Sequence, residues 1–469
     1  MLLVLLIFLL TIASTTNGAL NCSITLQEYD SLHSLYDSCA GTYWNWTINE
    51  PAKSRWVFPS SLWAPCGDSW QGIECTLISS QMCAIVALNL TNYNLSGTLV
   101  SSLGNISALE TIYFGSNSLV GKIPVQIGTL TRLSVIDFSV NSLTGSIPSV
   151  LGNLLQLNGL YLNNNTLYNS IPTSLGRLYQ LQYLFLNSNQ LTGKIPTSFG
   201  NLTELLILRL DVNKLSSTLP SYLFNMFGLR ELYLSTNKFI GSLPTNLGYL
   251  LSLNRLEIAS NHITGPLPSQ LGILTKMLFF NVQNNAITSS LPSQLGLLTN
   301  VQVFDISSNL VTGSIPSTFC QIHSWIALNL YSNFLHGSGL GCIMQAAYLN
   351  YLAVNINYFS GSIPNSFGLL HQVYELDFGY NLLSGSIPST IANMTSLVDL
   401  VLSGNIGITG TIPESLGIMS RLIAIDFSLM NLHGWYRYLY IFIVCMYDMF
   451  SYMNDVFYPL SIYTYFTVS

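Results

Sequence analysis

Leucines alternate with other residues in short L-x-L segments that recur every 24 residues along most of the chain. This period of two predicts a short strand whose leucines point inward while the intervening residues face outward. An asparagine follows each segment at a fixed distance, and so strict a period indicates a solenoid whose coils stack on one another. The recurring asparagines are Asn117, Asn141, Asn165, Asn189, Asn213, Asn237, Asn261, Asn285, Asn309, Asn333, Asn357, Asn381 and Asn405.

Each of these ladder asparagines is expected inside its coil, where the chain leaves the strand. There the amide can bond to backbone groups of its own and adjacent turns that burial would otherwise leave unsatisfied. A glycine four residues later supplies a turn that a residue with a Cβ resists, and a proline follows it. Asn169, Ser217 and Ser289 replace that glycine. Asparagine tolerates the left-handed region, whereas the two serines predict a locally different turn.

The 24-residue pattern with its G-x-I-P element, complete in residues 184–196, resembles the plant-type leucine-rich-repeat family. That family includes the extracellular parts of receptor-like proteins and receptor kinases, and secreted polygalacturonase inhibitors. The resemblance covers residues 85–434, about fifteen coils, and implies an α/β-type solenoid: a right-handed superhelix with one parallel β-sheet on its concave side.

Residues 66–75, Cys-Gly-Asp-Ser-Trp-Gln-Gly-Ile-Glu-Cys, resemble the N-terminal cap of the same family, which would occupy residues 20–84. Residues 29–36 resemble the short amphipathic helix of that cap, and residues 40–46 its tryptophan-rich loop. A lid of this kind is physically required, because a solenoid exposes the core of its first coil.

The cysteine usage indicates disulfides in an oxidising compartment. The resemblance to the cap implies a bond between Cys66 and Cys75. Cys320 and Cys342 are nearly one repeat apart and are expected to pair across adjacent coils. Cys22, Cys39, Cys83 and Cys445 receive no assigned partner. No histidine stands at ligand spacing with these cysteines, so no metal site is expected.

An N-terminal apolar run at residues 2–13 is too short to span a bilayer comfortably, and small polar residues follow it. Residues 1–19 are therefore expected to be a signal peptide. Sequons downstream suit a chain that passes through a glycosylating lumen. The candidate glycosylation sites are Asn45, Asn89, Asn94, Asn105, Asn164, Asn201 and Asn393; Asn21 is also in a sequon but adjoins Cys22 and the cleavage region.

Charged residues make up only 7% of the chain, against about a quarter in ordinary soluble domains. With 14 basic and 20 acidic side chains there is no basic stripe to neutralise phosphates, so nucleic acid is not expected as a partner. The sequence has no H-E-x-x-H, phosphate loop, G-x-S-x-G or kinase motif. We therefore expect neither an enzyme nor a cofactor.

Aromatic residues and opposed charges gather at outward strand positions between the fourth and eighth coils. Aromatic and arginine side chains contribute large contact energies when desolvated, so this cluster is the candidate ligand-binding site. The alternative is that tyrosines suit strand surfaces by propensity and that the charged members form surface ion pairs. The cluster comprises Tyr161, Tyr183, Phe185, Arg209, Asp211, Glu231, Tyr233, Arg255 and Glu257.

One binding mode of the resembled family can be compared with this cluster. Family receptors that hold the free C-terminal carboxylate of a peptide use a paired Arg-x-Arg on one strand. Here Arg209-x-Asp211 and Arg255-x-Glu257 stand at comparable positions, with an acid in place of the second arginine.

The C-terminal residues 435–469 leave the repeat pattern, and Met430 already stands where a ladder asparagine belongs. Residues 438–447 are apolar, but extension to 438–453 as a membrane anchor would bury Asp448, which costs several kcal/mol. Three interpretations stand: a membrane segment, an aromatic cap over the last coil, or an incomplete end.

The predicted function is recognition at the cell surface or outside the cell. The ligand would be a protein, peptide or glycan bound on the concave face, with a co-receptor as a further partner if the chain is part of a receptor complex. Two alternatives differ in class: a secreted inhibitor of wall-degrading glycosidases, and a structural or adhesive matrix protein. The sequence does not identify the ligand or the oligomeric state.

Overall fold

The computed structural model describes residues 23–46, 55–56, 58, 65–66, 70–79 and 81–433. The expected signal peptide, Cys22, the tail at 435–469 with its candidate anchor, and Cys445 lie outside these residues, as does the side chain of Cys342. The chain divides into two compact units, Met1–Thr264 and Gly265–Ser469, which are described separately.

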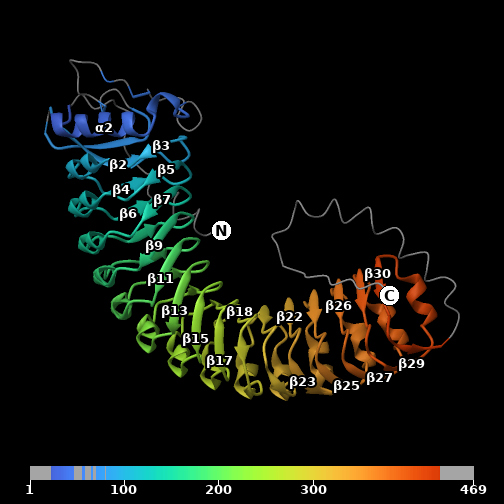
Figure 1. Cartoon of the computed structure of the whole chain (residues 1–469). Helices are drawn as coiled ribbons and strands as arrows, with labels where there is room; N and C mark the ends of the chain where they lie inside the picture. The colour runs from blue at the N-terminus through green and yellow to red at the C-terminus, as the bar shows by residue number, and fades with distance from the viewer. Residues whose placement is uncertain are drawn as a thin grey trace. The chain divides into compact units, whose positions relative to one another are not determined.

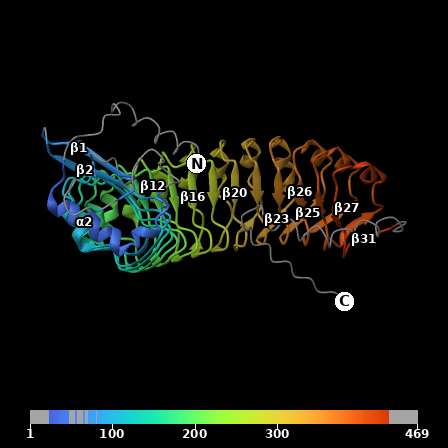
Figure 2. The same cartoon turned by 90° about the horizontal axis from the view of Figure 1, so that it is seen from above.

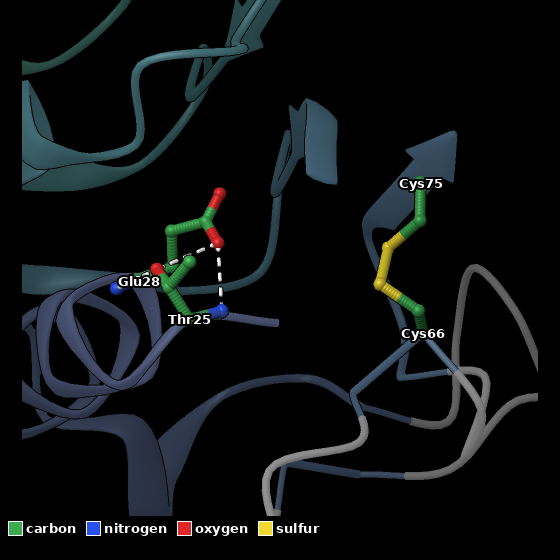
Figure 3. The surroundings of a disulfide bond; sticks show 4 residues. All are labelled: Thr25, Glu28, Cys66 and Cys75. Carbon is green, nitrogen blue, oxygen red and sulfur yellow. Dashed lines mark hydrogen bonds between the residues drawn. A yellow bond between two sulfur atoms is a disulfide. The ribbon is translucent and has the colours of Figure 1, made fainter. Parts of the chain in front are cut away.

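The N-terminal cap is built around the α-helix α2 (Leu26–Ser38), which is longer than the helix expected from the sequence. Thr25 caps the helix: its hydroxyl accepts from the amide of Glu28, and the carboxylate of Glu28 accepts from the amide of Thr25. A disulfide joins Cys66 to Cys75, as the family resemblance implied (Figure 3). The capping box fixes the start of the helix, and the disulfide fixes the loop that precedes the first coil.

Behind α2, the tryptophans of the cap form a buried aromatic cluster. The ring centroid of Trp44 lies 5.0 Å from that of Trp46 and 5.1 Å from that of Trp56. The indole of Trp44 donates to the carbonyl of Cys39, whose thiol is buried and free. Burial raises the pKa of that thiol to about 12, so Cys39 is an inert packing residue.

The coils of the first unit contribute one strand each to a long parallel sheet, and β1 of the cap pairs antiparallel with β2 at its start (Figure 1). In the three-residue strands the central residue, such as Leu184 or Leu232, is fully buried, and its neighbours are half-exposed. The strands are β1 (Ile73–Leu77), β2 (Cys83–Asn89), β4 (Thr111–Tyr113), β6 (Val135–Asp137), β8 (Gly159–Tyr161), β10 (Tyr183–Phe185), β12 (Ile207–Arg209), β14 (Glu231–Tyr233) and β16 (Arg255–Glu257).

The second unit repeats this arrangement with the same in-register pairing, which confirms the predicted solenoid of stacked parallel strands. We refer to the outward side of the long sheet in each unit as its strand face. The strands of the second unit are β18 (Phe279–Asn281), β20 (Val303–Asp305), β22 (Ala327–Asn329), β24 (Tyr351–Ala353), β26 (Glu375–Asp377), β28 (Asp399–Val401) and β30 (Ala424–Asp426).

A second row of short parallel strands, which the sequence reasoning missed, follows the ladder asparagines. Figure 2 shows both rows in the second unit, with β20 and β26 in one and β23, β25, β27 and β31 in the other. The strands of the first unit are β3 (Ser96–Thr98), β5 (Ser118–Gly121), β7 (Ser142–Gly145), β9 (Thr166–Ser170), β11 (Gln190–Gly193), β13 (Lys214–Thr218) and β15 (Lys238–Gly241), followed by β17 (His262–Gly265). Those of the second unit are β19 (Ala286–Ile287), β21 (Thr312–Gly313), β23 (Phe334–Gly337), β25 (Tyr358–Ser362), β27 (Leu382–Gly385), β29 (Gly407–Gly410) and β31 (Asn431–Leu432).

Each coil closes through a short 3₁₀ helix, and the G-x-I-P proline caps most of these helices in extended conformation. Where Leu340 replaces the proline, the helix η12 begins at Gly339 and has seven residues instead of five. The 3₁₀ helices are η1 (Gly41–Tyr43) in the cap, then η2 (Ser101–Asn105), η3 (Val125–Thr129), η4 (Ser149–Asn153), η5 (Thr173–Arg177), η6 (Thr197–Asn201), η7 (Ser221–Asn225), η8 (Thr245–Tyr249), η9 (Ser269–Ile273), η10 (Ser293–Leu297), η11 (Ser317–Gln321), η12 (Gly339–Gln345), η13 (Asn365–Leu369), η14 (Ser389–Asn393) and η15 (Glu414–Ile418).

The ladder asparagines bond to the backbone of their own coil and of the coil before it. The Nδ2 of Asn237 donates to the carbonyls of Leu234 and Ser235 in its own coil at 3.2 and 3.3 Å, and to that of Leu210 at 3.0 Å. Its Oδ1 accepts from the amide of Leu215 at 2.9 Å. The same contacts recur in the second unit, for example at Asn333. Each ladder amide thus satisfies backbone groups at the points where one strand ends and another begins.

Our expectation of a different turn at the two serines is wrong. Ser217 has φ +83° and Ser289 has φ +68°, which match the glycines at the equivalent position, such as Gly193 at +78°. The residue before each ladder asparagine is also left-handed, and it includes the β-branched Val140, Val212 and Ile356. Parallel pairing on both sides imposes this backbone path on residues that do not favour it.

Replacement of a ladder asparagine tests the structural role of its amide. Asn237→Ala removes the side-chain partner of three carbonyls and one amide, so the free energy of unfolding should fall by about 3 kcal/mol. Urea unfolding measures this change. Asn246→Ala on η8, whose side chain has a single contact at 3.5 Å, is the control and should change stability by less than about 0.5 kcal/mol.

The left-handed turn provides a second test. Substitutions at two equivalent positions should change the free energy of unfolding in opposite directions. Gly193→Ala adds a Cβ that meets only Ser170 at 3.6 Å, so its expected cost of about 1 kcal/mol is backbone strain. Ser217→Gly relieves the same strain and should stabilise the fold by about 0.5 kcal/mol. Thermal unfolding measures both changes, and destabilisation by Ser217→Gly would contradict this explanation of the turn.

Candidate ligand-binding face

The nine residues of the predicted cluster all lie in the first unit, on or directly after five consecutive strands of the long sheet, β8 to β16. We name them the aromatic–ionic patch. Tyr161, Phe185, Arg209, Tyr233 and Glu257 are direct cross-strand neighbours in one column. Because adjacent strands are about 4.8 Å apart, side chains in such a column contact one another.

The N-terminal half of the patch is aromatic. The ring of Tyr161 lies edge-on to that of Phe185 at a centroid distance of 5.0 Å and stacks with that of Tyr183 at 6.4 Å. Burial, followed by the neighbouring Tyr183, raises the pKa of the Tyr161 hydroxyl, which therefore stays protonated as a hydrogen-bond donor. This half offers half-buried ring surface with a neutral polar atom.

Arg209 lies at the centre of the patch, between two rings. Its guanidinium carbon is 4.4 Å from the ring centroid of Tyr233 and 5.9 Å from that of Phe185. The same guanidinium donates to both carboxylate oxygens of Asp211, at 3.2 and 3.1 Å. Burial acts to lower the pKa of Arg209, but the hydrogen bonds to Asp211, together with the charges of Asp211, Tyr233 and Glu257, hold the pKa above its ordinary value. The arginine is thus fixed in position before any ligand arrives.

The C-terminal half of the patch is also internally paired. Arg255 donates to Glu257 at 2.7 Å, and the hydroxyl of Tyr233 donates to Glu231 at 2.7 Å. Burial, and then the bond to Glu231, raise the pKa of Tyr233. Each arginine therefore binds an acid two residues further along its own coil. These two ion pairs are of the kind that the alternative interpretation of the cluster predicts. The patch presents ring faces and oriented polar groups, with its two guanidinium groups already engaged.

Asn187 is a residue of this region that the sequence reasoning missed. It follows Phe185 by two residues and occupies the position in its coil that Asp211 occupies in the next. Its side chain is buried, and its Oδ1 accepts no hydrogen bond in the described structure. An orphaned buried oxygen of this kind costs about 1–3 kcal/mol. Asn187 lies 24 residues before Asp211, and this spacing could have identified it as a neighbour of the patch from the sequence.

The other predicted sites are dispersed over the chain. Six of the sequon asparagines are exposed and Asn45 is half-buried, so their use stays a prediction. Cys83 and Cys320 are disulfide-bonded, and the pairing of Cys320 with Cys342 also stays a prediction. Among the described residues, no group of three His, Cys, Asp or Glu side chains could hold a metal ion. In the same residues, no helix combines the length and hydrophobicity that a bilayer crossing needs.

The strand face of the second unit has a different character, because acids gather there. Glu375 and Asp377 on β26 lie beside Asp399 on β28, and Asp426 lies on β30. Residues 306–413 contain no Lys or Arg to oppose them. Burial, with further repulsion from Asp399, Glu375 and Asp426, raises the pKa of Asp377 to about 7, although a hydrogen bond from the amide of Gly379 acts against this rise.

The raised pKa of Asp377 predicts a pH-dependent stability. The folded chain holds this proton more tightly than the unfolded chain, whose pKa is near 3.8, so the free energy of unfolding should fall as pH rises from about 4 to about 7. Asp377→Asn stays neutral and should stabilise the protein by about 2 kcal/mol at pH 8, with little effect at pH 4.

Thermal unfolding across this pH range measures the effect. An unchanged profile in Asp377→Asn would show that this carboxyl does not titrate in the predicted range.

Comparison with known proteins supports the fold. The sequence model of the Leucine Rich Repeat family matches residues 132–154, 180–202, 228–250 and 300–322. No curated protein sequence matches the chain.

Among solved structures, the chain is similar to a TDR receptor, with 27% identity and a TM-score of 0.68 over 74% of this chain and 64% of that one. It thus spans less than two thirds of the receptor chain. The Arabidopsis receptor kinase HAESA, in complex with the peptide hormone IDA and the co-receptor SERK1, matches with 25% identity and a TM-score of 0.58 over 87% of this chain and 82% of that one. A leucine-rich-repeat protein of Leptospira interrogans matches with 28% identity and a TM-score of 0.60 over 72% of this chain and 83% of that one.

Proposed function

We propose that this chain, a leucine-rich-repeat protein of the plant type, is an extracellular recognition protein that binds a peptide on the strand face of its first unit. The aromatic–ionic patch is the observation that carries this proposal. In a chain with 7% charged residues, five charged side chains and four aromatic rings lie together on five consecutive strands. Similarity to the HAESA complex supports a peptide as the ligand class.

The patch would bind through ring contact and hydrogen bonding. Phe185 and Tyr233 provide the ring surface, and Arg209 is held rigid between them, so little side-chain entropy is lost on binding. Because Arg209 and Arg255 already bond to Asp211 and Glu257, capture of a free peptide carboxylate is not the favoured mode. An extended peptide that lies across the strands would instead donate to Glu231 and Glu257 and stack on the rings.

Asn187 would adjust to such a ligand. Its Oδ1 lacks a donor in the described structure, and a ligand N–H that draws this oxygen toward the surface would relieve its desolvation cost. Only a ligand with a hydrogen-bond donor near Asn187 gains this free energy. A peptide backbone has such a donor at every residue other than proline.

The protein would pass its signal on by binding rather than by catalysis. The patch has no Ser, Thr, Cys, His or Lys, and the hydroxyls of Tyr161 and Tyr233 stay protonated. A partner receptor would then complete the signalling unit, as the co-receptor in the HAESA complex suggests.

Two substitutions test the proposed site. Phe185→Ala and Tyr233→Ala should each weaken peptide binding about tenfold or more, because each removes a ring that contacts Arg209. The ligands are peptides selected from a random display library on the secreted protein, and their affinities are measured by isothermal titration calorimetry.

Tyr351→Ala on β24 is the matched control, since Tyr351 is a half-buried strand-face tyrosine outside the patch. The control should bind each peptide as the wild type does, and all three variants should be secreted normally. Equal affinity of both patch variants and the wild type would remove the patch as the site. Selection of no peptide at all would contradict the peptide class.

A further inference from the structure

The second row of strands in the second unit carries exposed apolar side chains at one repeated position. This position directly follows the ladder asparagine. Ala286 at this position is small, but from Asn309 onward the residues there are large, apolar and 43% to 67% exposed. We name them the apolar stripe: Leu310, Phe334, Tyr358, Leu382 and Ile406. Ile356 and Tyr380, at the left-handed position of two of these coils, add exposed apolar surface beside it.

The first unit has a different surface at the same position. Its equivalent residues are all polar or basic: Ser118, Ser142, Thr166, Gln190, Lys214, Lys238 and His262. Because the backbone conformation and strand pairing are the same in both units, the fold itself does not require an apolar residue there. The stripe is therefore a property of the second unit and calls for its own explanation.

Two members of the stripe stack on each other, and the described second-row strands of this unit contain no Lys, Arg, Asp or Glu. The rings of Phe334 and Tyr358 stack at a centroid distance of 6.0 Å. Their cross-strand partners are the polar residues Thr312 and His336, and Ser360 pairs with Leu382. Between residues 306 and 413 the charged residues are Glu375, Asp377 and Asp399, and all three lie on the long sheet.

The exposed area of the stripe is that of a protein interface. Five half-exposed large side chains with Ile356 and Tyr380 present on the order of 600 Å² of apolar surface, at the upper limit for a typical monomer. Two such surfaces placed face to face would bury on the order of 1,200 Å², which is enough for a stable dimer.

We propose that the apolar stripe is the contact surface for a second copy of this chain, in a two-fold symmetric dimer with stripe against stripe. An uncharged apolar surface is complementary to itself, and a two-fold contact needs only such self-complementarity. Asn393 has the one sequon of the described second unit and lies on η14, so no stripe residue is itself a glycosylation site. The stripe shares no residue or strand with the aromatic–ionic patch, and this proposal does not depend on the proposed function.

Sedimentation equilibrium of the full-length secreted protein tests this proposal. The wild type should be a dimer at micromolar concentration. Phe334→Ser combined with Tyr358→Ser should raise the dimer dissociation constant at least about a hundredfold, because both rings are lost from each side of the contact. The matched control is Tyr168→Ser, which removes an exposed aromatic from β9 in the second row of the first unit and should leave the constant unchanged.

A second variant keeps the test informative if the double variant folds poorly. Leu382→Lys places one positive charge on each copy within the contact, and repulsion should give a monomer with an unchanged melting temperature. A wild type that stays monomeric at micromolar concentration would overturn the proposal. So would a dimer that both stripe variants leave intact, since another surface would then hold the copies together.

Discussion

The hydrogen bonds of the ladder asparagines are the interaction on which the structure depends. At most ladder positions a buried or half-buried side chain donates to carbonyls of two coils and accepts from an amide, as Asn237 does. Aspartate has no donor, and alanine has neither group, so the carboxamide of asparagine meets the need at the shortest length. The parallel stacking of strands, the left-handed residue before the asparagine and the second row of strands after it all follow from this exit geometry.

The same constraint allows neighbouring residues on the sheet surface to be identified from the sequence. Because successive coils stack in register, strand positions 24 residues apart become neighbours, and the chemistry of a column can be followed from coil to coil. The first unit uses its columns for rings and paired charges around Arg209, and the second gathers acids around Asp377. The two units also differ on the second row of strands. The residue after the ladder asparagine is polar in the first unit and apolar in the second. A single repeat thus carries several different surfaces, one for each column and unit.

The sequence predicted the elements that recur by periodicity and missed those imposed by stacking. Leu184 and Leu232 alternate as strand residues do, and both are fully buried. By contrast, Phe334–Gly337 forms a strand after a left-handed residue, in a segment whose glycine and serine content is typical of a turn. Ser217 likewise adopts a glycine-like conformation because its neighbours on both sides are paired, which no local preference reveals. For the candidate site, the register identified Phe185, Arg209 and Tyr233, but not which acid each arginine binds or that Asn187 is orphaned, since those depend on side-chain rotamers.

The central claim is that ligand binds across strands β8 to β16. The most direct measurement is photo-crosslinking of a library-selected peptide that carries a benzophenone, with the modified residues mapped by mass spectrometry. The account predicts crosslinks to members of the aromatic–ionic patch, above all to Phe185 and Tyr233. Crosslinks confined to the second row of strands, to the 3₁₀ helices or to the second unit would contradict it.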